Sequence, residues 1–207
     1  MLIEIGPGKG ALTKLIKDIS PQFIAIEKDK EMLGFHEDLK PLPNPPLEGE
    51  GIKVPPMRGD LGGSILLCDI LQVNLSNIIP NPRKTLIVGN LPYYITSPIL
   101  RMFFGYGKQE YAGGIFMVQK EVAEKVKYDA DKKSYLWWLL NYAYQVKLIK
   151  SVPAKAFKPA PKVTSAVIQL ERGDLGGSFQ KLLEFLEDFA PYSRKTLGAI
   201  STMIKKK

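Results

Sequence analysis

The stretch Met1-Leu2-Ile3-Glu4-Ile5-Gly6-Pro7-Gly8-Lys9-Gly10 decides the fold. Its first half is an apolar run that predicts a buried strand, and its second half is a glycine-rich turn. A helix is expected over residues 11–19, because apolar residues recur at helical spacing at Leu12, Leu15, Ile16 and Ile19. Glycines let a backbone approach a ligand closely, and the start of a helix offers free N–H groups. The stretch therefore predicts an α/β fold with a cradle for a nucleotide-like ligand.

The glycine spacing separates this turn from two better-known nucleotide-binding loops. Gly6, Gly8 and Gly10 give the pattern G-x-G-x-G, whereas the dinucleotide-binding fingerprint is G-x-G-x-x-G. The turn also lacks the Lys-Ser or Lys-Thr ending of a phosphate-binding loop. The pattern argues against NAD and ATP as ligands, although a short glycine pattern is weak evidence by itself.

Two further predicted strands each lead to an acidic residue. The run Phe23 to Ile26 leads to Glu27, which is placed to accept hydrogen bonds from both hydroxyls of a ribose. The run Ile65 to Cys68 leads to Asp69, which is placed to accept a hydrogen bond from an adenine amine, with Ile70 and Leu71 packing on the ring. The alternatives are a solvated carboxylate at Glu27 and a helix cap at Asp69.

The stretch Asn90-Leu91-Pro92-Tyr93-Tyr94 follows another apolar run, Thr85 to Gly89. A residue before proline avoids helical geometry, so the chain is expected to leave this strand extended. An amide, backbone carbonyls and two rings are then presented at the carboxyl end of a strand, where open α/β sheets bind ligands. An amide beside aromatic faces suits a planar group with an exocyclic amine, such as adenine. The alternative is a proline-containing turn with core tyrosines.

The remaining pattern predicts further helices and strands. Helices are expected over residues 28–39, 96–104, 119–126 and 134–144, and strands over residues 113–118, 146–152 and 163–170. Thr96 or Ser97 is the expected cap of the second of these helices. His36 is the only histidine and has no second metal ligand nearby, so we assign it a structural role and expect no metal site. Cys68 is expected to pack as a small buried apolar group.

Residues 40–64 differ in composition from their surroundings. Prolines cluster there and would block both a helix and a central strand, so the segment is expected to be an exposed, disordered insertion. The run Arg58 to Ser64 recurs unchanged at Arg172 to Ser178. A single recurrence is not a solenoid pattern, and we interpret both copies as inserted sequence without a catalytic role.

The segment Pro153 to Lys162 joins the last two predicted strands. It combines Phe157 with Lys155, Lys158 and Lys162 among prolines that stiffen the backbone. A rigid cationic loop with one ring is suited to contact phosphates and to stack a base. The alternative is a solvated connector.

The overall charge also favours a polyanionic partner. Lys and Arg number 29 against 21 Asp and Glu, which gives a net charge of +8 and a pI near 9.4. Nucleic acid is the expected partner, and solubility is the alternative explanation. One cysteine excludes an internal disulfide framework and fits a reducing cytosol. Without a long apolar segment or a signal peptide, we expect a cytoplasmic protein, a monomer by default, with no membrane partner.

Six stretches together resemble the small-subunit ribosomal RNA adenine N6,N6-dimethyltransferases. In chain order they are LIEIGPGKGALT at 2–13, AIE at 25–27, DIL at 69–71, VGNLPYYITSPI at 88–99, MVQKEVA at 117–123 and AFKPAPKVTSAV at 156–167. The resemblance implies an S-adenosylmethionine-dependent methyltransferase fold. This fold is Rossmann-like, a mostly parallel seven-stranded sheet with helices on both faces.

The resemblance also implies functional residues. S-adenosylmethionine would be held by Glu4, Gly6, Gly8, Gly10, Glu27, Lys28, Asp69, Ile70 and Asn90. The catalytic set would be Asn90, Leu91, Pro92 and Tyr93, which receive an adenine flipped out of ribosomal RNA. The Asn90 side-chain oxygen and the carbonyl of Leu91 or Pro92 would accept the two N–H bonds of its amine. Tyr93 would stack on the base, whereas Tyr94 would be a packing residue. Phe157 would close the other face of the base, and the lysines of the 153–162 loop would contact RNA.

The family pattern predicts a division of the chain. Residues 1–171 would form the catalytic domain, and residues 172–207 a linker and a shortened C-terminal helical segment, helical by pattern from 179 onward. The family carries a Gln-Asn-Phe motif and helices before the first strand, which this chain does not include. We therefore expect the fold to follow the family and leave the activity of the shortened chain to experiment.

Three functions are compatible with the sequence. The first is adenine dimethylation of small-subunit ribosomal RNA during ribosome maturation. The second is methylation of large-subunit ribosomal RNA with antibiotic resistance, but Asn90-Leu91-Pro92 and Lys120-Glu121-Val122-Ala123 look more like the first group. The third is a non-catalytic RNA-binding or ribosome-assembly protein on a degenerate methyltransferase scaffold. The intact glycine loop, the two strand-end acids and Asn90 argue against this third function.

Overall fold

The computed structural model describes residues 1–43, 63–75, 78–106 and 109–173. Most of the 40–64 segment and the helical pattern expected from residue 179 onward lie outside these ranges, as does most of the second copy of the repeat. The division into residues 1–171 and 172–207 stays a prediction.

A single eight-stranded sheet forms the centre of the protein, in the order β3-β4-β2-β1-β5-β6-β8-β7. In this order the first six strands, β3, β4, β2, β1, β5 and β6, run parallel to one another. The strand β8 is antiparallel to both β6 and β7. The strand bounds are β1 Leu2–Ile5, β2 Phe23–Glu27, β3 Lys40–Pro41, β4 Ser64–Leu67, β5 Leu86–Asn90, β6 Gly113–Gln119, β7 Tyr144–Val152 and β8 Ser165–Arg172. This mostly parallel sheet confirms the Rossmann-like α/β fold expected from the sequence.

The expected number of seven strands is wrong by one, because the short strand β3 lies inside the proposed insertion. The backbone nitrogen of Lys40 donates to Gly63 O at 2.9 Å, and that of Leu42 donates to Ile65 O at 2.8 Å. Pro41 lacks an N–H group, which an edge strand tolerates. Both ends of the 40–64 segment therefore belong to the edge of the sheet.

The helices expected over 96–104 and 119–126 are found nearly as predicted, whereas those expected over 11–19, 28–39 and 134–144 are shorter. The helices are α1 Thr13–Ile16, α2 Thr96–Phe104, α3 Lys120–Val126 and α4 Tyr135–Asn141, with 3-10 turns η1 Lys30–Phe35, η3 Pro82–Lys84, η4 Tyr93–Ile95 and η5 Ala154–Ala156. The helix expected over 11–19 is reduced to α1. Leu15 in α1 is 74% exposed, and Ile19, beyond the end of α1, is 72% exposed. Helices gain most of their stability from packing an apolar face, and the described part of the chain leaves these two residues of the expected face uncovered. The helix expected over 28–39 is the 3-10 turn η1.

Two other helix ends differ from the prediction for reasons visible in the contacts. Ile95, and neither Thr96 nor Ser97, occupies the N-cap of α2. The helix α4 ends at Asn141, whose buried side chain donates to Val126 O and accepts from Val146 N, at 2.9 and 3.1 Å. This amide ties the end of α4 to α3 and to β7.

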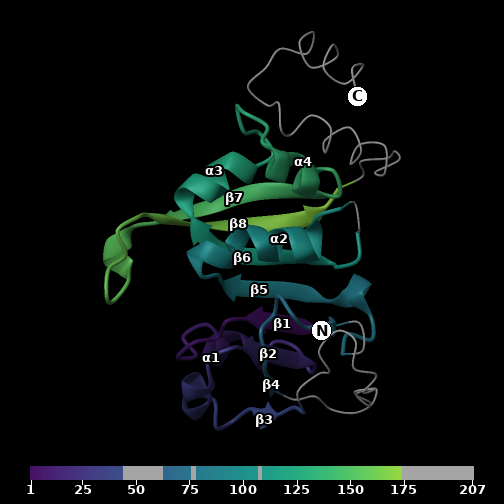
Figure 1. Cartoon of the computed structure of the whole chain (residues 1–207), viewed down its shortest axis with the longest axis vertical. Coiled ribbons are helices and arrows are strands. Elements are labelled where there is room, and N and C mark those ends of the chain that lie inside the picture. The colour runs from purple at the N-terminus through teal and green to yellow at the C-terminus, as the bar shows by residue number, and fades with distance from the viewer. Residues whose placement is uncertain (44–62, 76–77, 107–108, 174–207) are drawn as a thin grey trace, which may run out of the picture.

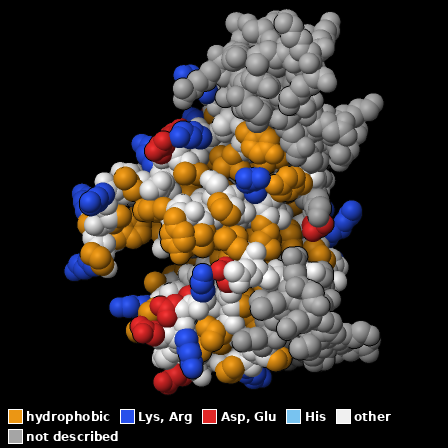
Figure 2. All heavy atoms as spheres, viewed as in Figure 1, with side chains coloured by type: hydrophobic (Ala, Val, Ile, Leu, Met, Phe, Trp, Pro, Cys, Tyr) orange, Lys and Arg blue, Asp and Glu red, His pale blue; other side chains and the backbone are white. Residues whose placement is uncertain are grey.

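The helices cover the two faces of the sheet unequally. Figure 1 shows α2, α3 and α4 together over one face of β6, β8 and β7, with α1 beside β1 and β2. The main core lies under the three helices and includes the fully buried rings of Phe104, Phe116 and Tyr144. Figure 2 shows apolar side chains gathered on the outer surface of this helical layer, where Met102 and Trp138 are 41% and 37% exposed.

The connection between β7 and β8 projects from the body of the protein (Figure 1). We call residues 153–164 of this connection the arm. Its lysines, Lys155, Lys158 and Lys162, are all exposed. Within the described ranges, no helix has the length and apolar character needed to cross a membrane.

Candidate active site

The carboxyl ends of four parallel strands meet around one cavity of about 390 Å³. Its walls include Gly6 after β1, Glu27 at the end of β2, Asp69 after β4 and Pro92 after β5. Ile70 and Lys28 also line it, so most of the residues predicted to bind a cofactor gather at one place. Parallel strands present their carboxyl ends at the same edge of a sheet, and for this reason residues far apart in sequence converge here.

The glycine loop after β1 leaves open space beside its backbone. Gly6 and Gly8 have φ angles of +68° and +53°, in the left-handed region that favours glycine. A Cβ atom at either residue would meet no atom within 4 Å. Gly6 lines both this cavity and a larger neighbouring cavity, so the loop forms the boundary between them.

The Glu27 carboxylate shapes the glycine loop directly. Its Oε2 accepts a hydrogen bond from Gly8 N at 3.0 Å, and its Oε1 accepts from Lys28 N and Asp29 N at 2.8 and 2.9 Å. The residue is 7% exposed. An ionised carboxylate has about four lone-pair positions, so three backbone donors leave it little further capacity.

Asp69 lies across the same cavity, paired with Lys28. The Lys28 ammonium donates to Asp69 Oδ2 at 2.8 Å, and Leu71 N donates to Oδ1 at 3.0 Å. These hydrogen bonds, that from Lys28 first, hold the pKa of the Asp69 carboxyl below its ordinary value. Beside it, burial raises the pKa of the Cys68 thiol to about 12. The thiol therefore stays protonated near neutral pH and is a poor nucleophile.

Asn90 ends β5 with its side chain exposed. No hydrogen bond joins this carboxamide to any residue in the described ranges, so its oxygen and its NH₂ group are both available. The next residue, Leu91, is anchored through its nitrogen, which donates to Met117 O at 3.1 Å. Its carbonyl accepts from no donor in the same ranges.

The carbonyl of Pro92 is occupied, in contrast to that of Leu91. It accepts from the Thr96 hydroxyl at 3.1 Å and from Ile95 N at 3.2 Å. A carbonyl oxygen has two lone pairs, so these donors satisfy Pro92. Of the two carbonyls that the sequence left open, that of Leu91 is the one without a donor among the described residues, although Leu91 as a whole is 1% exposed.

The two tyrosines after Pro92 have different environments. Tyr93 is 36% exposed, and its hydroxyl lies 3.1 Å from Ser165 Oγ at the start of β8. Tyr94 is 81% exposed and lines the 390 Å³ cavity. The prediction that Tyr94 is a packing residue is wrong, because its neighbours at the strand end form a cavity wall instead of a core. Tyr93 lines neither cavity, and its stacking role stays a prediction.

The larger cavity, of about 780 Å³, brings Asn90 and Phe157 together. Phe157 reaches it from the arm, and Gly6 and Gly8 form part of the same lining. The other walls are mostly apolar and come from α1 and from one face of the sheet, including Leu2, Ile16, Leu86, Val88, Ile115, Met117 and Val167. The sequence analysis did not identify Met117 or Val167, although alternation along their strands gives the signal that places them on this face.

Glu4 also lines the larger cavity but is 1% exposed. Its Oε2 has no hydrogen-bond partner in the described ranges. Burial raises the pKa of this carboxyl above its ordinary value. A buried acceptor without a partner is costly and is a feature of sites that receive a ligand donor.

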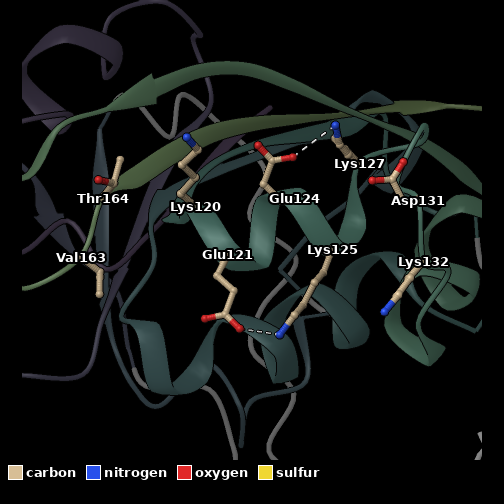
Figure 3. A pocket seen from close by; sticks show the side chains of 9 residues that line it. All are labelled: Lys120, Glu121, Glu124, Lys125, Lys127, Asp131, Lys132, Val163 and Thr164. Carbon is tan, nitrogen blue, oxygen red and sulfur yellow. Dashed lines mark hydrogen bonds and ion pairs between the residues drawn. The ribbon is translucent and has the colours of Figure 1, made fainter. Parts of the chain in front are cut away.

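A third cavity, of about 700 Å³, lies on α3 and contains none of the predicted site residues. Its charged lining, drawn in Figure 3, consists of Lys120, Lys125, Lys127 and Lys132 together with Glu121, Glu124 and Asp131. Lys125 pairs with Glu121 at 2.6 Å, and Lys127 pairs with Glu124 at 3.2 Å. Because its charges are largely matched, this hollow is a weaker candidate for a polyanion than the arm.

Comparisons with known proteins identify the family of the chain. The family model described as ribosomal RNA adenine dimethylase matches residues 1–190. A ribosomal RNA small subunit methyltransferase A of Desulfitobacterium hafniense is 36% identical over 204 residues, which covers 95% of this chain and 66% of the relative. The enzyme of the same name from Clostridium perfringens is 32% identical, over 83% of this chain and 55% of its own length. This chain therefore spans less than two thirds of these relatives.

Two crystal structures share the fold. A dimethyladenosine transferase from Plasmodium falciparum matches with a TM-score of 0.70 at 22% identity, over 96% of this chain and 66% of its own. The 23S rRNA methyltransferase ErmE matches with a TM-score of 0.67 at 24% identity, over 90% of this chain and 68% of its own. At these identities the likeness concerns the fold alone.

Proposed function

The chain belongs to the ribosomal RNA adenine dimethylase family, and on that premise we propose that it dimethylates the N6 amine of adenines in small-subunit ribosomal RNA, using S-adenosylmethionine. The observation that carries the proposal is the Asn90 carboxamide, which lines the larger cavity beside the glycine loop and has no hydrogen-bond partner among the described residues. The carbonyl of the next residue, Leu91, also has no donor among them. The names of the relatives support the small subunit as the source of the substrate.

The residues around the glycine loop fit the proposed cofactor. Open space beside Gly6 and Gly8 admits a ligand next to the backbone. Glu27 has one remaining acceptor position for a ribose hydroxyl, and Asp69 can accept from an adenine amine while keeping Leu71 N as a partner. The Lys28 ammonium donates to Asp69 Oδ2, so on cofactor binding Lys28 has to share that oxygen with the adenine amine or move away from it. When bound, S-adenosylmethionine supplies an electrophilic methyl group.

Asn90 and Leu91 orient the amine that accepts the methyl group. An adenine amine is a poor nucleophile because its lone pair is delocalised into the ring. Hydrogen bonds from its two N–H groups to the Asn90 oxygen and the Leu91 carbonyl favour a pyramidal nitrogen with a localised lone pair. Each transfer releases one proton, and an amide oxygen is too weakly basic to keep it, so the proton passes to water. Orientation and electrostatic stabilisation dominate, and no strong general base is needed.

Phe157 and the arm lysines receive the RNA in this proposal. Phe157 lines the cavity that contains Asn90, and a ring stacked on a base contributes about 1–3 kcal/mol. Flipping a base costs a few kcal/mol and least when the base is unpaired, so an accessible RNA loop is the favoured substrate. The exposed lysines of the arm can contact the flanking phosphates. Cytoplasmic location and a monomeric state are part of the same proposal.

Neither alternative function is favoured by a specific observation. The fold likeness to a 23S rRNA methyltransferase carries no information on substrate, because the identity is only 24%. A non-catalytic scaffold would not be expected to retain an exposed, unpaired asparagine beside an open glycine loop.

The decisive experiment measures transfer of tritiated methyl groups to undermethylated small ribosomal subunits, followed by identification of the methylated nucleoside. We expect label in N6,N6-dimethyladenosine from small subunits and none from large subunits. Label in large subunits instead would favour the second function. If the chain binds small subunits and no label is transferred at millimolar S-adenosylmethionine, the scaffold function replaces this proposal.

A further inference from the structure

His36 lies beneath the glycine loop and forms a hydrogen bond with it. The residue is 3% exposed, and its Nε2 is 2.8 Å from the carbonyl oxygen of Gly8. A carbonyl oxygen only accepts hydrogen bonds, so Nε2 carries the proton and donates it. The sequence gives His36 no neighbouring metal ligand and suggests a merely structural role, but the side chain contacts the loop at its central glycine.

Gly8 is held on both of its polar backbone atoms. Its nitrogen donates to Glu27 Oε2 at 3.0 Å, and its carbonyl accepts from His36. Glycine is the residue with the greatest backbone freedom, and Gly8 has a φ angle of +53°. The two side chains together fix the peptide units before and after this residue, and hence the direction in which the loop presents its amides.

The His36 ring also packs against the last glycine of the loop. A Cβ atom at Gly10 would lie 3.1 Å from His36 Cε1, which is tighter than an ordinary contact. Two residues further along, Asp38 forms a hydrogen bond with Lys17, next to the end of α1. The segment that carries His36 is therefore attached both to the loop and to the chain that follows it.

We propose that His36 is a positioning residue, whose imidazole fixes the Gly8 carbonyl so that the glycine loop is preformed for its ligand. The identity of that ligand as S-adenosylmethionine rests on the proposed function. The effect on the loop itself does not depend on the ligand. Since His36 lines neither cavity, it acts through Gly8 and not by contact with the ligand.

Three variants separate a positioning role from simple core packing. In His36→Gln, the side-chain NH₂ group can donate from nearly the position of Nε2. In His36→Asn the shorter side chain does not reach Gly8, and in His36→Leu the donor is removed. The matched control is Ile79→Ala, because Ile79 is also 3% exposed but lies in the main core before β5, at the opposite end of that strand from the site.

Two measurements are made on the full chain. Hydrogen–deuterium exchange reports opening of residues 6–12 without ligand, and calorimetric titration gives the dissociation constant for S-adenosylmethionine. Leaving a buried acceptor unpaired should raise both the loop exchange rate and the dissociation constant by about tenfold or more in His36→Asn and His36→Leu. His36→Gln should stay within about threefold of the parent chain, because it keeps the donor. Ile79→Ala should lower the melting temperature and change neither the loop exchange rate nor the dissociation constant.

The outcomes distinguish this inference from the proposed function. Equal effects of His36→Gln and His36→Asn, or a loop opened equally by Ile79→Ala, would overturn the positioning role. If the parent chain binds no S-adenosylmethionine but loop exchange responds as expected, the positioning role holds and the cofactor assignment fails. If His36→Leu does not fold, the loop exchange rates and dissociation constants of His36→Asn and His36→Gln still test the positioning role.

Discussion

Glu27 Oε2, at the end of β2, accepts a hydrogen bond of 3.0 Å from Gly8 N in the loop after β1. Because β1 and β2 are adjacent and parallel, with Ile5 beside Ile26, the acid reaches the loop without any distortion of the sheet. One carboxylate therefore serves both the shape of the loop and the proposed ribose contact. Its removal should affect stability and ligand affinity together.

Glu27→Gln tests this double role. The new NH₂ group would face backbone N–H donors, so at least one of the three hydrogen bonds is lost. Hydrogen bonds to a charged group contribute about 1.5–3 kcal/mol, and we expect the free energy of unfolding to fall by about that amount. Affinity for S-adenosylmethionine should fall by about tenfold or more. Chemical denaturation and calorimetric titration measure the two quantities.

The exposed acid Glu31, on the turn η1, is the control for Glu27. Glu31→Gln should change neither stability nor affinity appreciably. Weakened binding by Glu27→Gln at unchanged stability would show that Glu27 serves the ligand alone, and the hydrogen bond with Gly8 would then contribute little.

Asn90→Ala tests the acceptor site. The change removes an exposed side chain that forms no hydrogen bond with the described residues, so the fold should be unaffected. We expect methyl transfer to be abolished while affinity for S-adenosylmethionine stays within a few-fold. The control is Asn81→Ala, an exposed asparagine that precedes the other end of β5. A parallel loss of affinity and transfer would assign Asn90 to the cofactor or to the fold.

The sequence predicts that the site residues lie together, because parallel strands bring their carboxyl ends to one edge of the sheet in whatever order the strands are arranged. Each parallel strand delivers its carboxyl end to the same edge, so Gly6, Glu27, Asp69 and Asn90 could be grouped from their positions after apolar runs alone. The residues on either side of these four positions also resemble the motifs of the family. The fold class and the location of the cavities follow from these local patterns.

Contacts between distant segments decide what the sequence could not predict. The Pro92 carbonyl is unavailable as an acceptor because Thr96 and Ile95 both donate to it. No sequence pattern predicts these two hydrogen bonds. The hydrogen bond of His36 with Gly8 depends on how η1 packs beneath the loop. The short helix α1 has the periodicity of a longer one, but periodicity does not reveal whether a neighbour covers its apolar face.

The arm lysines should bind RNA electrostatically. Replacing Lys155, Lys158 and Lys162 by alanine removes three exposed cations from one projecting segment. Each lysine that pairs with a phosphate adds about 0.7 to the slope of log affinity against log salt, so the triple variant should reduce the slope by about 2 if all three bind RNA. Filter binding to a small-subunit RNA fragment across a salt series measures this slope.

An equal charge change elsewhere is the control for the arm. Lys40, Arg83 and Lys84 are exposed and lie on β3 and in the turn before β5, away from the arm. Their replacement by alanine should reduce affinity only weakly and leave the slope nearly unchanged. Identical slopes for the two triple variants would mean that net charge, and not the arm, determines binding.

Glu4→Gln should change how stability depends on pH. Burial raises the pKa of Glu4 above its ordinary value of 4.5, so above about pH 4.5 the unfolded chain releases this proton before the folded chain does. Ionisation therefore favours unfolding, and the parent chain loses stability as pH rises from 4.5 to the pKa of the folded state. Glutamine removes this loss. Thermal unfolding without ligand should show Glu4→Gln more stable than the parent at pH 7, with the difference shrinking towards pH 4. A difference that stays constant over this range would show that the buried carboxyl is not the cause.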